Sequence, residues 1–248
     1  MVTSLKNRYW EIDTIRGIAI IMMIIFHFLY DLNYFHYFSL NLYNSYFQIY
    51  VYFTATLFLL LVGVSLTISY SKDQTTFSKN KIRLKFIRRG LFIFCLGLII
   101  TFATWIYLSR GFIIFGILHC IGISIILAYP FIRYKMQPFL VGVLFIAIGI
   151  IIKNQTFDFP WLLWLGFTPI NFFTIDYYPL LPWFGVVLIG ISLGNLFYPN
   201  GLRKFKLNDK THITFVKITT FLGRHSLIIY FLHQVILIGI LTLISFFY

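Results

Sequence analysis

The chain contains seven runs of mostly apolar residues, and most of them have at least the roughly 20 residues that a membrane-crossing helix needs. They lie at residues 14–35, 47–70, 87–107, 112–133, 138–152, 180–198 and 219–247, and the fifth is the shortest. Apolar residues make up 60% of the 248 residues and charged residues only 11%, whereas a soluble domain carries roughly 25% charged residues. The pattern predicts an all-α, polytopic transmembrane bundle of about seven helices, with residues 1–248 forming one domain.

Lysine and arginine gather in alternate loops. Successive loops alternate between the two sides of the membrane. Of the 20 lysines and arginines, only Arg110 and Lys153 fall in loops on one side, and the other 18 lie in or beside the loops on the opposite side. Because basic residues concentrate in cytoplasmic loops, we expect a plasma-membrane protein with its N-terminus inside and its C-terminus outside. The same placement explains the net charge of +13 by contact with membrane lipids, without a nucleic-acid partner. The first apolar run is expected to remain as an anchor rather than a cleaved signal peptide.

The first apolar run carries three ionisable residues on one face. Arg16 and His27 are eleven residues apart and Asp31 follows four later, so at 100° per residue all three share a stripe. A charge at the bilayer centre costs at least ~3 kcal/mol, which marks such residues as functional candidates. We expect Arg16 at the cytoplasmic mouth and His27 as a general base oriented by Asp31. The alternative is a structural His–Asp pair that ties this helix to a neighbour.

Other histidines fall at or near the predicted spans. His119 is expected at a depth similar to that of His27, where it either joins the same site or bonds a backbone carbonyl. His233 lies near mid-membrane and is interpreted as an interhelical hydrogen-bonding residue. Arg224 stands at the cytoplasmic boundary, where phosphate contact and snorkelling are both open, and His36 falls in the first outer loop.

Two loops carry further candidates. The cytoplasmic segment "KIRLKFIRRG" includes Lys85, Arg88 and Arg89, which suit either a phosphate-bearing substrate or lipid headgroups. The outer loop at 153–178 is rich in aromatic residues, typical of an interfacial belt, although "PWLLWLGF" also suits a re-entrant half-helix. Both cysteines fall within predicted spans, and no metal site is expected.

Six fragments, in order, resemble one known family. They are "EIDTIRGIAIIMMIIFHFLYDLNYF", "GVSLTISY", "RRGLFIFCLGLIITFATWIY", "GFIIFGILHCIGISIILAYPF", "DYYPLLPWFGVVLIGISLG" and "LGRHSLIIYFLHQ". Together they are similar to the bacterial and archaeal proteins grouped with the heparan-alpha-glucosaminide N-acetyltransferase catalytic domain. The Arg16-to-His27 spacing is also similar to the first-helix signature of the acyltransferase-3 membrane proteins. The resemblance covers nearly the whole chain.

This resemblance implies a membrane acetyltransferase. Such an enzyme takes acetyl-CoA from the cytoplasm and passes the acetyl group to a sugar or glycoconjugate on the outer face. His27 matches the histidine proposed as catalytic in acyltransferase-3 proteins, and Arg16 matches its basic partner. The lysosomal enzyme differs, with an Asn at the position of His27 and its catalytic His in the following loop, so His36 stays an alternative base.

Further residues are candidates for supporting roles. Arg88 and Arg89 match basic residues that the resemblance implies near the CoA phosphates, and Arg16, Lys85 and Arg224 are expected to contact them as well. His119 is expected to support substrate binding or oxyanion stabilisation. Acceptor contacts are expected from Asp176, Trp161, Trp164 and Trp183. The sequence leaves open whether the protein forms a homodimer. The competing function is a proton-coupled transporter with a relay of histidines, although the chain lacks the internal repeats that carriers often show.

Overall fold

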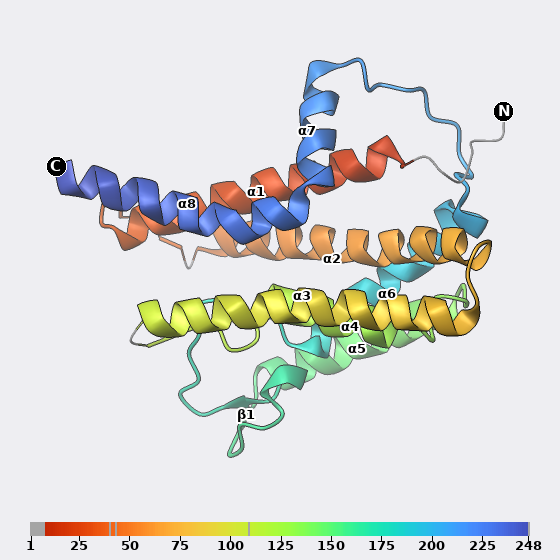
Figure 1. The fold of residues 1–248 in the computed structure, drawn as a ribbon. Coiled ribbons are helices and arrows are strands. Elements are labelled where there is room, and N and C mark those ends of the chain that lie inside the picture. Colours follow the sequence, from red (N-terminus) through yellow and green to blue (C-terminus); the bar gives the residue numbers. More distant parts are fainter. Residues whose placement is uncertain (1–7, 40, 43, 109, 248) are drawn as a thin grey trace. The chain divides into compact units, whose positions relative to one another are not determined.

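The computed structural model describes residues 8–39, 41–42, 44–108 and 110–247, and within them the protein is mostly helical (Figure 1). The α-helices are α1 (Trp10–Tyr34), α2 (Ser45–Gln74), α3 (Lys79–Tyr107), α4 (Ile117–Ala128), α5 (Gln137–Lys153), α6 (Leu180–Phe197), α7 (Thr214–Arg224) and α8 (Ser226–Phe247). The outer loop forms a two-residue parallel pairing between β1 (Thr156–Phe157) and β2 (Thr168–Pro169) and a short 3₁₀ turn, η1 (Leu163–Leu165). A second 3₁₀ turn, η2 (Pro199–Gly201), follows α6.

In the described part of the chain, five helices are long and apolar enough to cross a membrane: α1, α2, α3, α6 and α8. The two shorter apolar helices, α4 and α5, lie at the fourth and fifth predicted spans. The prediction of an all-α membrane bundle is therefore confirmed.

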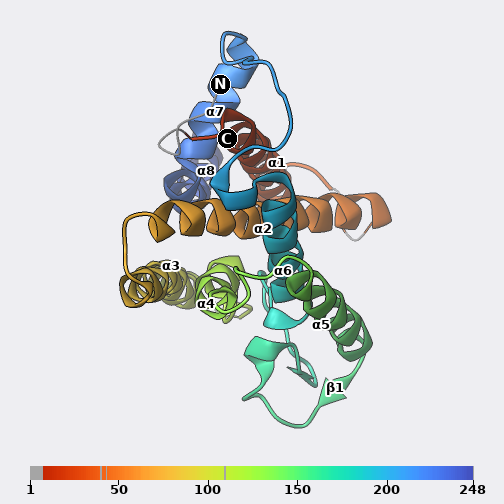
Figure 2. The same cartoon turned by 90° about the vertical axis from the view of Figure 1, so that its right-hand side faces the viewer.

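The described chain divides into two compact units. One comprises Leu59–Lys206, and the other comprises residues 8–58 together with 207–247. In the first unit α5 lies along α6, as both Figure 1 and Figure 2 show. A Cβ on Gly142 would lie 2.7 Å from the carbonyl oxygen of Gly185, so this approach requires small residues, as is common between membrane helices. That the whole chain acts as one domain stays a prediction.

The seventh predicted helix, 219–247, was wrong as a single element. The structure ends α7 at Arg224, and His225 has a non-helical backbone (φ −102°, ψ 14°) before α8 begins. The cause is tertiary packing. Added Cβ atoms on Gly17 of α1 and Gly223 of α7 would overlap backbone carbonyl oxygens of the opposite helix, so α7 is locked steeply across α1 (Figure 1).

The fourth predicted helix was too long. Residues 112–133 were expected to be helical, but α4 covers only Ile117–Ala128. Gly116, directly before α4, has an extended backbone (φ −86°, ψ −176°), and Phe115 forms an isolated bridge with Tyr177 of the outer loop. A loop partner that is distant in sequence therefore sets where this helix begins.

Candidate functional site

A cluster of polar side chains joins α1 to α8 within the second unit. The rings of His27 and His233 meet edge to face with centroids 4.7 Å apart. The next pair along the two helices is hydrogen-bonded, because Gln234 Nε2 donates to Asp31 Oδ1 over 2.8 Å. Asp31 and His233 are both buried. Two helices separated by nearly the whole sequence thus place four functional groups together in an apolar setting.

The partner of Asp31 differs from the expected one. The sequence predicts that Asp31 orients His27, since the two are four residues apart on one helix face. In the described structure Gln234 supplies the hydrogen bond to Asp31, and His27 contacts the rings of His233 and Phe26. A shared face brings two side chains near each other, but the amide donor on α8 decides which bond forms.

His233 has the geometry of an oriented base. Its Nδ1 lies 2.6 Å from the carbonyl oxygen of Tyr230. Because a carbonyl oxygen only accepts, Nδ1 must carry the proton, and Nε2 of the neutral ring keeps its lone pair. Nε2 is buried without a hydrogen-bond partner in the described structure. Sequence reasoning interpreted His233 as a structural residue; the adjacent Gln234 in an otherwise apolar helix was the signal for a polar site.

Other buried polar atoms also lack a partner. Among the described residues, Asp31 Oδ2 and Gln234 Oε1 are buried without a hydrogen-bond partner, as is the hydroxyl of Tyr37 in the turn after α1. Leaving such a group unpaired costs roughly 1–3 kcal/mol, so buried polar atoms in native proteins normally have a partner, whether protein, water or ligand. A ligand with several O–H or N–H groups matches this set of acceptors.

His36 lies outside the cluster, in the turn that follows α1. Its side chain is exposed, and its backbone is in the left-handed region with a φ of 61°. It stays the alternative base, as the sequence predicts, without a hydrogen-bonded orienting group on its ring among the described contacts.

A buried carboxylate organises the N-terminal part of α1. Arg16 Nη1 donates to Asp13 Oδ1 over 3.1 Å, and Arg224 Nε donates to Asp13 Oδ2 over 3.3 Å. Asp13 is only 4% exposed. Sequence reasoning proposed both arginines as phosphate contacts and missed the carboxylate that holds them. The i, i+3 spacing of Asp13 and Arg16 was the available signal.

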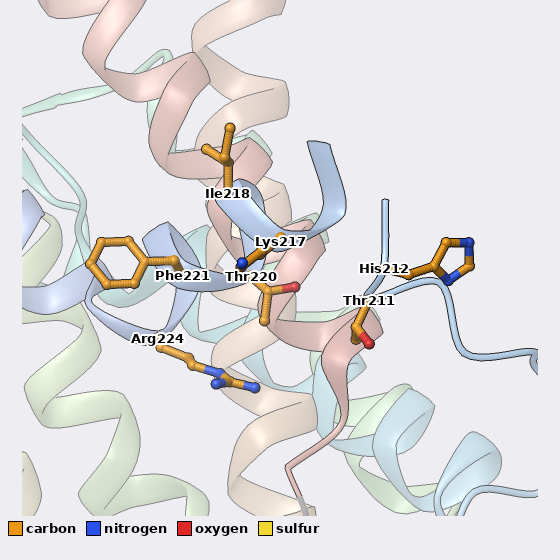
Figure 3. A pocket seen from close by; sticks show the side chains of 7 residues that line it. All are labelled: Thr211, His212, Lys217, Ile218, Thr220, Phe221 and Arg224. Atoms are coloured by element: carbon orange, nitrogen blue, oxygen red, sulfur yellow. The ribbon is translucent and has the colours of Figure 1, made fainter. Parts of the chain in front are cut away.

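A cavity of about 650 Å³ lies beside α7 in the same unit (Figure 3). Its lining comes from α7 and the segment before it: Thr211, His212, Lys217, Ile218, Thr220, Phe221 and Arg224. In Figure 3, Lys217 and Thr220 lie between Phe221 on one side and the pair Thr211 and His212 on the other. The cavity therefore combines cationic, hydroxyl and apolar groups.

His119, in the first unit, is fully engaged. Its Nδ1 accepts from the backbone N–H of Gly116 over 3.2 Å, which leaves Nε2 to donate to Thr101 Oγ1 at 3.4 Å. The ring stacks on Phe115 and meets Phe94 edge on, and it is 2% exposed. This arrangement favours the structural alternative for His119 over a role in catalysis.

The predicted phosphate contacts on α3 fall into two settings. Lys85 Nζ lies 2.6 and 2.7 Å from the two carboxylate oxygens of Asp73, which is itself 7% exposed. Lys85 therefore neutralises a buried acid. Arg88 and Arg89 have exposed side chains on α3, and Arg89 is also attracted to Asp73. Both stay predicted phosphate contacts.

The outer-loop candidates are also dispersed. Asp176 Oδ2 accepts from the backbone N–H of Ile117 over 3.2 Å, at the start of α4. Burial raises the pKa of Asp176 to about 6, against the opposing effect of the Ile117 N–H. Trp161 and Trp164 are exposed, whereas Trp183 is 7% exposed and packs on Tyr178. Of the three tryptophans predicted to contact the acceptor, only Trp161 and Trp164 are accessible to an external molecule.

The family comparison accounts for most of the chain. Residues 8–235 match the family "Heparan-alpha-glucosaminide N-acetyltransferase, catalytic". No curated protein and no solved structure matches the chain. The match spans α1 to α7 and extends into α8 beyond His233 and Gln234, so both halves of the polar cluster lie within it. The resemblance predicted from the six fragments is confirmed, and the chain belongs to the heparan-alpha-glucosaminide N-acetyltransferase catalytic family, a family of acetyltransferases.

Proposed function

We propose that the protein transfers an acetyl group from cytoplasmic acetyl-CoA to an amine or hydroxyl of a carbohydrate or glycoconjugate on the outer face of the plasma membrane. The observation that carries the proposal is Nε2 of His233, which is buried without a hydrogen-bond partner among the described residues. The Tyr230 carbonyl orients the ring through Nδ1, and the ring of His27 flanks it. A base held by a third group is the arrangement that general-base catalysis uses.

The chemistry needs no group beyond the two substrates and the histidine pair. A ring nitrogen of His233 or His27 takes the acceptor's proton while the acceptor oxygen or nitrogen bonds to the thioester carbonyl carbon. The carbon–sulfur bond then breaks, and the imidazolium returns its proton to the CoA thiolate. General-base assistance of this kind contributes roughly 10²–10⁴-fold, and holding two substrates together contributes much of the rest.

The acceptor is held, in this proposal, by the acid–amide pair. Asp31 and Gln234 each keep a buried oxygen that bonds to no group in the described part of the protein. These oxygens would accept hydrogen bonds from hydroxyl or amino groups of a sugar. Trp161 and Trp164, which are exposed on the outer loop of the first unit, stay proposed acceptor contacts by themselves.

The donor is proposed to bind through cations. Arg16, anchored by Asp13, is the proposed phosphate contact in the second unit, and Arg88 and Arg89 are those on α3. Guanidinium groups suit phosphate oxygens because two N–H groups can bond at once. Lys85 is not needed for this role, since Asp73 already holds it.

The test is acetyl transfer by the purified full chain in nanodiscs, with acetyl-labelled acetyl-CoA and a panel of amino sugars and neutral sugars. His233→Gln and His27→Gln are each expected to lower transfer by roughly 10²–10⁴-fold while CoA still stabilises the protein. His36→Gln is the matched control. Full activity in both cluster variants, with loss in His36→Gln, would move the base to the outer loop. Solute flux in liposomes without acetyl-CoA would instead favour the transporter.

A further inference from the structure

Helix α7 has a narrow face that packs against α1. Its buried residues are Val216, Thr219, Thr220 and Gly223, which recur at intervals of three and four residues. Thr220 bonds to Thr14 of α1 through their hydroxyls over 2.9 Å. The contact with α1 uses small and β-branched side chains. Most of the surface of α7 therefore does not pack against α1.

The outward side of α7 is apolar and cationic. Phe215, Ile218 and Phe221 are 59%, 53% and 60% exposed. At 100° per residue, Lys217 and Arg224 lie about 20° apart around the axis and Phe221 follows about 40° beyond Lys217. Cations and large apolar side chains therefore adjoin along one side of a helix of eleven residues.

The direction of α7 suggests what covers this side. α7 crosses α1 steeply (Figure 1), and α1 is a candidate membrane span. A helix that crosses a spanning helix in this way runs along the membrane surface, where amphipathic helices bury apolar side chains at the headgroup boundary. The crossing lies near Asp13 and Gly17, at the end of α1 that basic residues mark as cytoplasmic.

Charge selects the lipid. Residues 203–224 contain six lysines and arginines and a single acid, Asp209. The cavity beside α7 has about 650 Å³ and offers Lys217 next to Ile218 and Phe221 (Figure 3). We propose that this cavity binds an anionic phospholipid of the cytoplasmic leaflet, with its phosphate at Lys217 and an acyl chain along Ile218 and Phe221. A soluble nucleotide would leave the exposed apolar side chains uncovered.

The test measures lipid retention by the full chain, which needs no acetyl transfer. Protein purified in detergent is exchanged into phosphatidylglycerol or phosphatidylcholine of the same acyl chains, and bound lipid is counted by native mass spectrometry. We expect wild-type protein to retain phosphatidylglycerol preferentially. Lys217→Gln should lower that retention about fivefold, as the loss of about 1 kcal/mol per cation at an anionic surface implies.

Lys210→Gln is the matched control, because it removes the same charge from the preceding segment without altering the cavity lining. It should retain phosphatidylglycerol like the wild type, and Ile218→Ser should lose retention of it. Equal retention of the two lipids by the wild type, or unchanged phosphatidylglycerol in Lys217→Gln, would overturn the proposal. Displacement of the bound lipid by CoA would overturn it as well and assign the cavity to a nucleotide phosphate.

Discussion

His27 and His233 present their rings to each other at 4.7 Å with an interplanar angle of 63°, and only His233 has a ring nitrogen bonded to a backbone carbonyl, among the described contacts of the pair. The two imidazoles are therefore inequivalent. One is held in a defined tautomer, and the other adjoins it without a hydrogen-bonded orienting group. Proton transfer through this pair would begin at the oriented ring, which makes the two residues a unit rather than two independent bases.

A double-mutant cycle tests this unit. His27→Gln and His233→Gln should each lower kcat by roughly 10²–10⁴-fold, the contribution of a general base. The double variant should be scarcely slower than the worse single variant, because residues that act together are not additive. The measurement is steady-state acetyl transfer at saturating acetyl-CoA. Fully additive losses would show two separate roles.

The apolar runs alone predict α1, α2, α5 and α6 to within four residues at each end, because helices in a membrane must be apolar wherever their partners lie. They miss the first eight residues of α3, Lys79 to Phe86, because basic residues there interrupt the apolar pattern. The break between α7 and α8 could not be predicted in this way. Residues 219–247 read as one apolar run, and the break depends on the contact of Gly223 with the carbonyl oxygen of Asp13 on α1. Because that contact is between helices distant in sequence, it produces no periodic pattern of apolar residues from which the break could be predicted.

The candidate site divides similarly. Helical spacing correctly puts Arg16, His27 and Asp31 on one helix, but it cannot choose their partners. Gln234, which bonds Asp31, is 203 residues away, and Asp13, which holds Arg16, is only three residues away and was overlooked. Local periodicity therefore finds candidates, whereas partners must come from the fold.

The Asp31–Gln234 pair is expected to control the acceptor. Gln234→Ala should raise KM for the acceptor and destabilise the protein by roughly 1–3 kcal/mol, because it leaves a buried carboxylate oxygen unbonded. Enzyme kinetics with a varied acceptor and thermal unfolding would measure the two effects. Gln234→Glu is the informative companion, since it keeps the size but sets a second carboxyl group against Asp31. An unchanged acceptor KM in both variants would restrict the pair to a structural role.

The cations of α3 should separate by function. Arg88→Ala combined with Arg89→Ala should raise KM for acetyl-CoA, with a smaller effect on unfolding than Lys85→Ala, because both side chains are exposed and of the two only Arg89 is attracted to the buried Asp73. Lys85→Ala should leave KM for acetyl-CoA unchanged and destabilise the protein, because the buried Asp73 loses its ion-pair partner. Breaking a fully buried ion pair is strongly destabilising, and the cost should be smaller here because the Lys85 side chain is half-exposed. Titrations of acetyl-CoA and thermal unfolding of both variants would decide. An unchanged KM in the double variant would return Arg88 and Arg89 to lipid headgroup contact.

Asp176 should make stability depend on pH. Its pKa in the folded protein is about 6, above the ordinary 3.8, so between these values the folded state binds more protons than the unfolded state. The carboxyl group therefore contributes stability that is complete below pH ~4 and is lost as pH rises through about 6. The loss is at most about 3 kcal/mol. Thermal unfolding from pH 4 to pH 7 should show this decline in the wild type.

Asp176→Asn is the control for that titration, because it keeps an oxygen that can accept from the Ile117 N–H but has no proton to lose. Its unfolding temperature should be flatter across the same pH range. A decline as steep as that of the wild type would assign the pH dependence to other groups.

Replacing glycine by alanine should have opposite effects on stability at two positions of the second unit, Gly223 and Gly239. A Cβ on Gly223 would overlap the carbonyl oxygen of Asp13, whereas a Cβ on Gly239 of α8 would meet nothing within 4 Å. Gly223→Ala should force α7 away from α1 and cost roughly 1–3 kcal/mol, as overpacking does. Gly239→Ala should stabilise the protein by up to about 1 kcal/mol, because alanine favours a helix interior. Thermal unfolding of the two variants in the same detergent compares them directly, and a stabilised Gly223→Ala would refute the close crossing of α1 and α7.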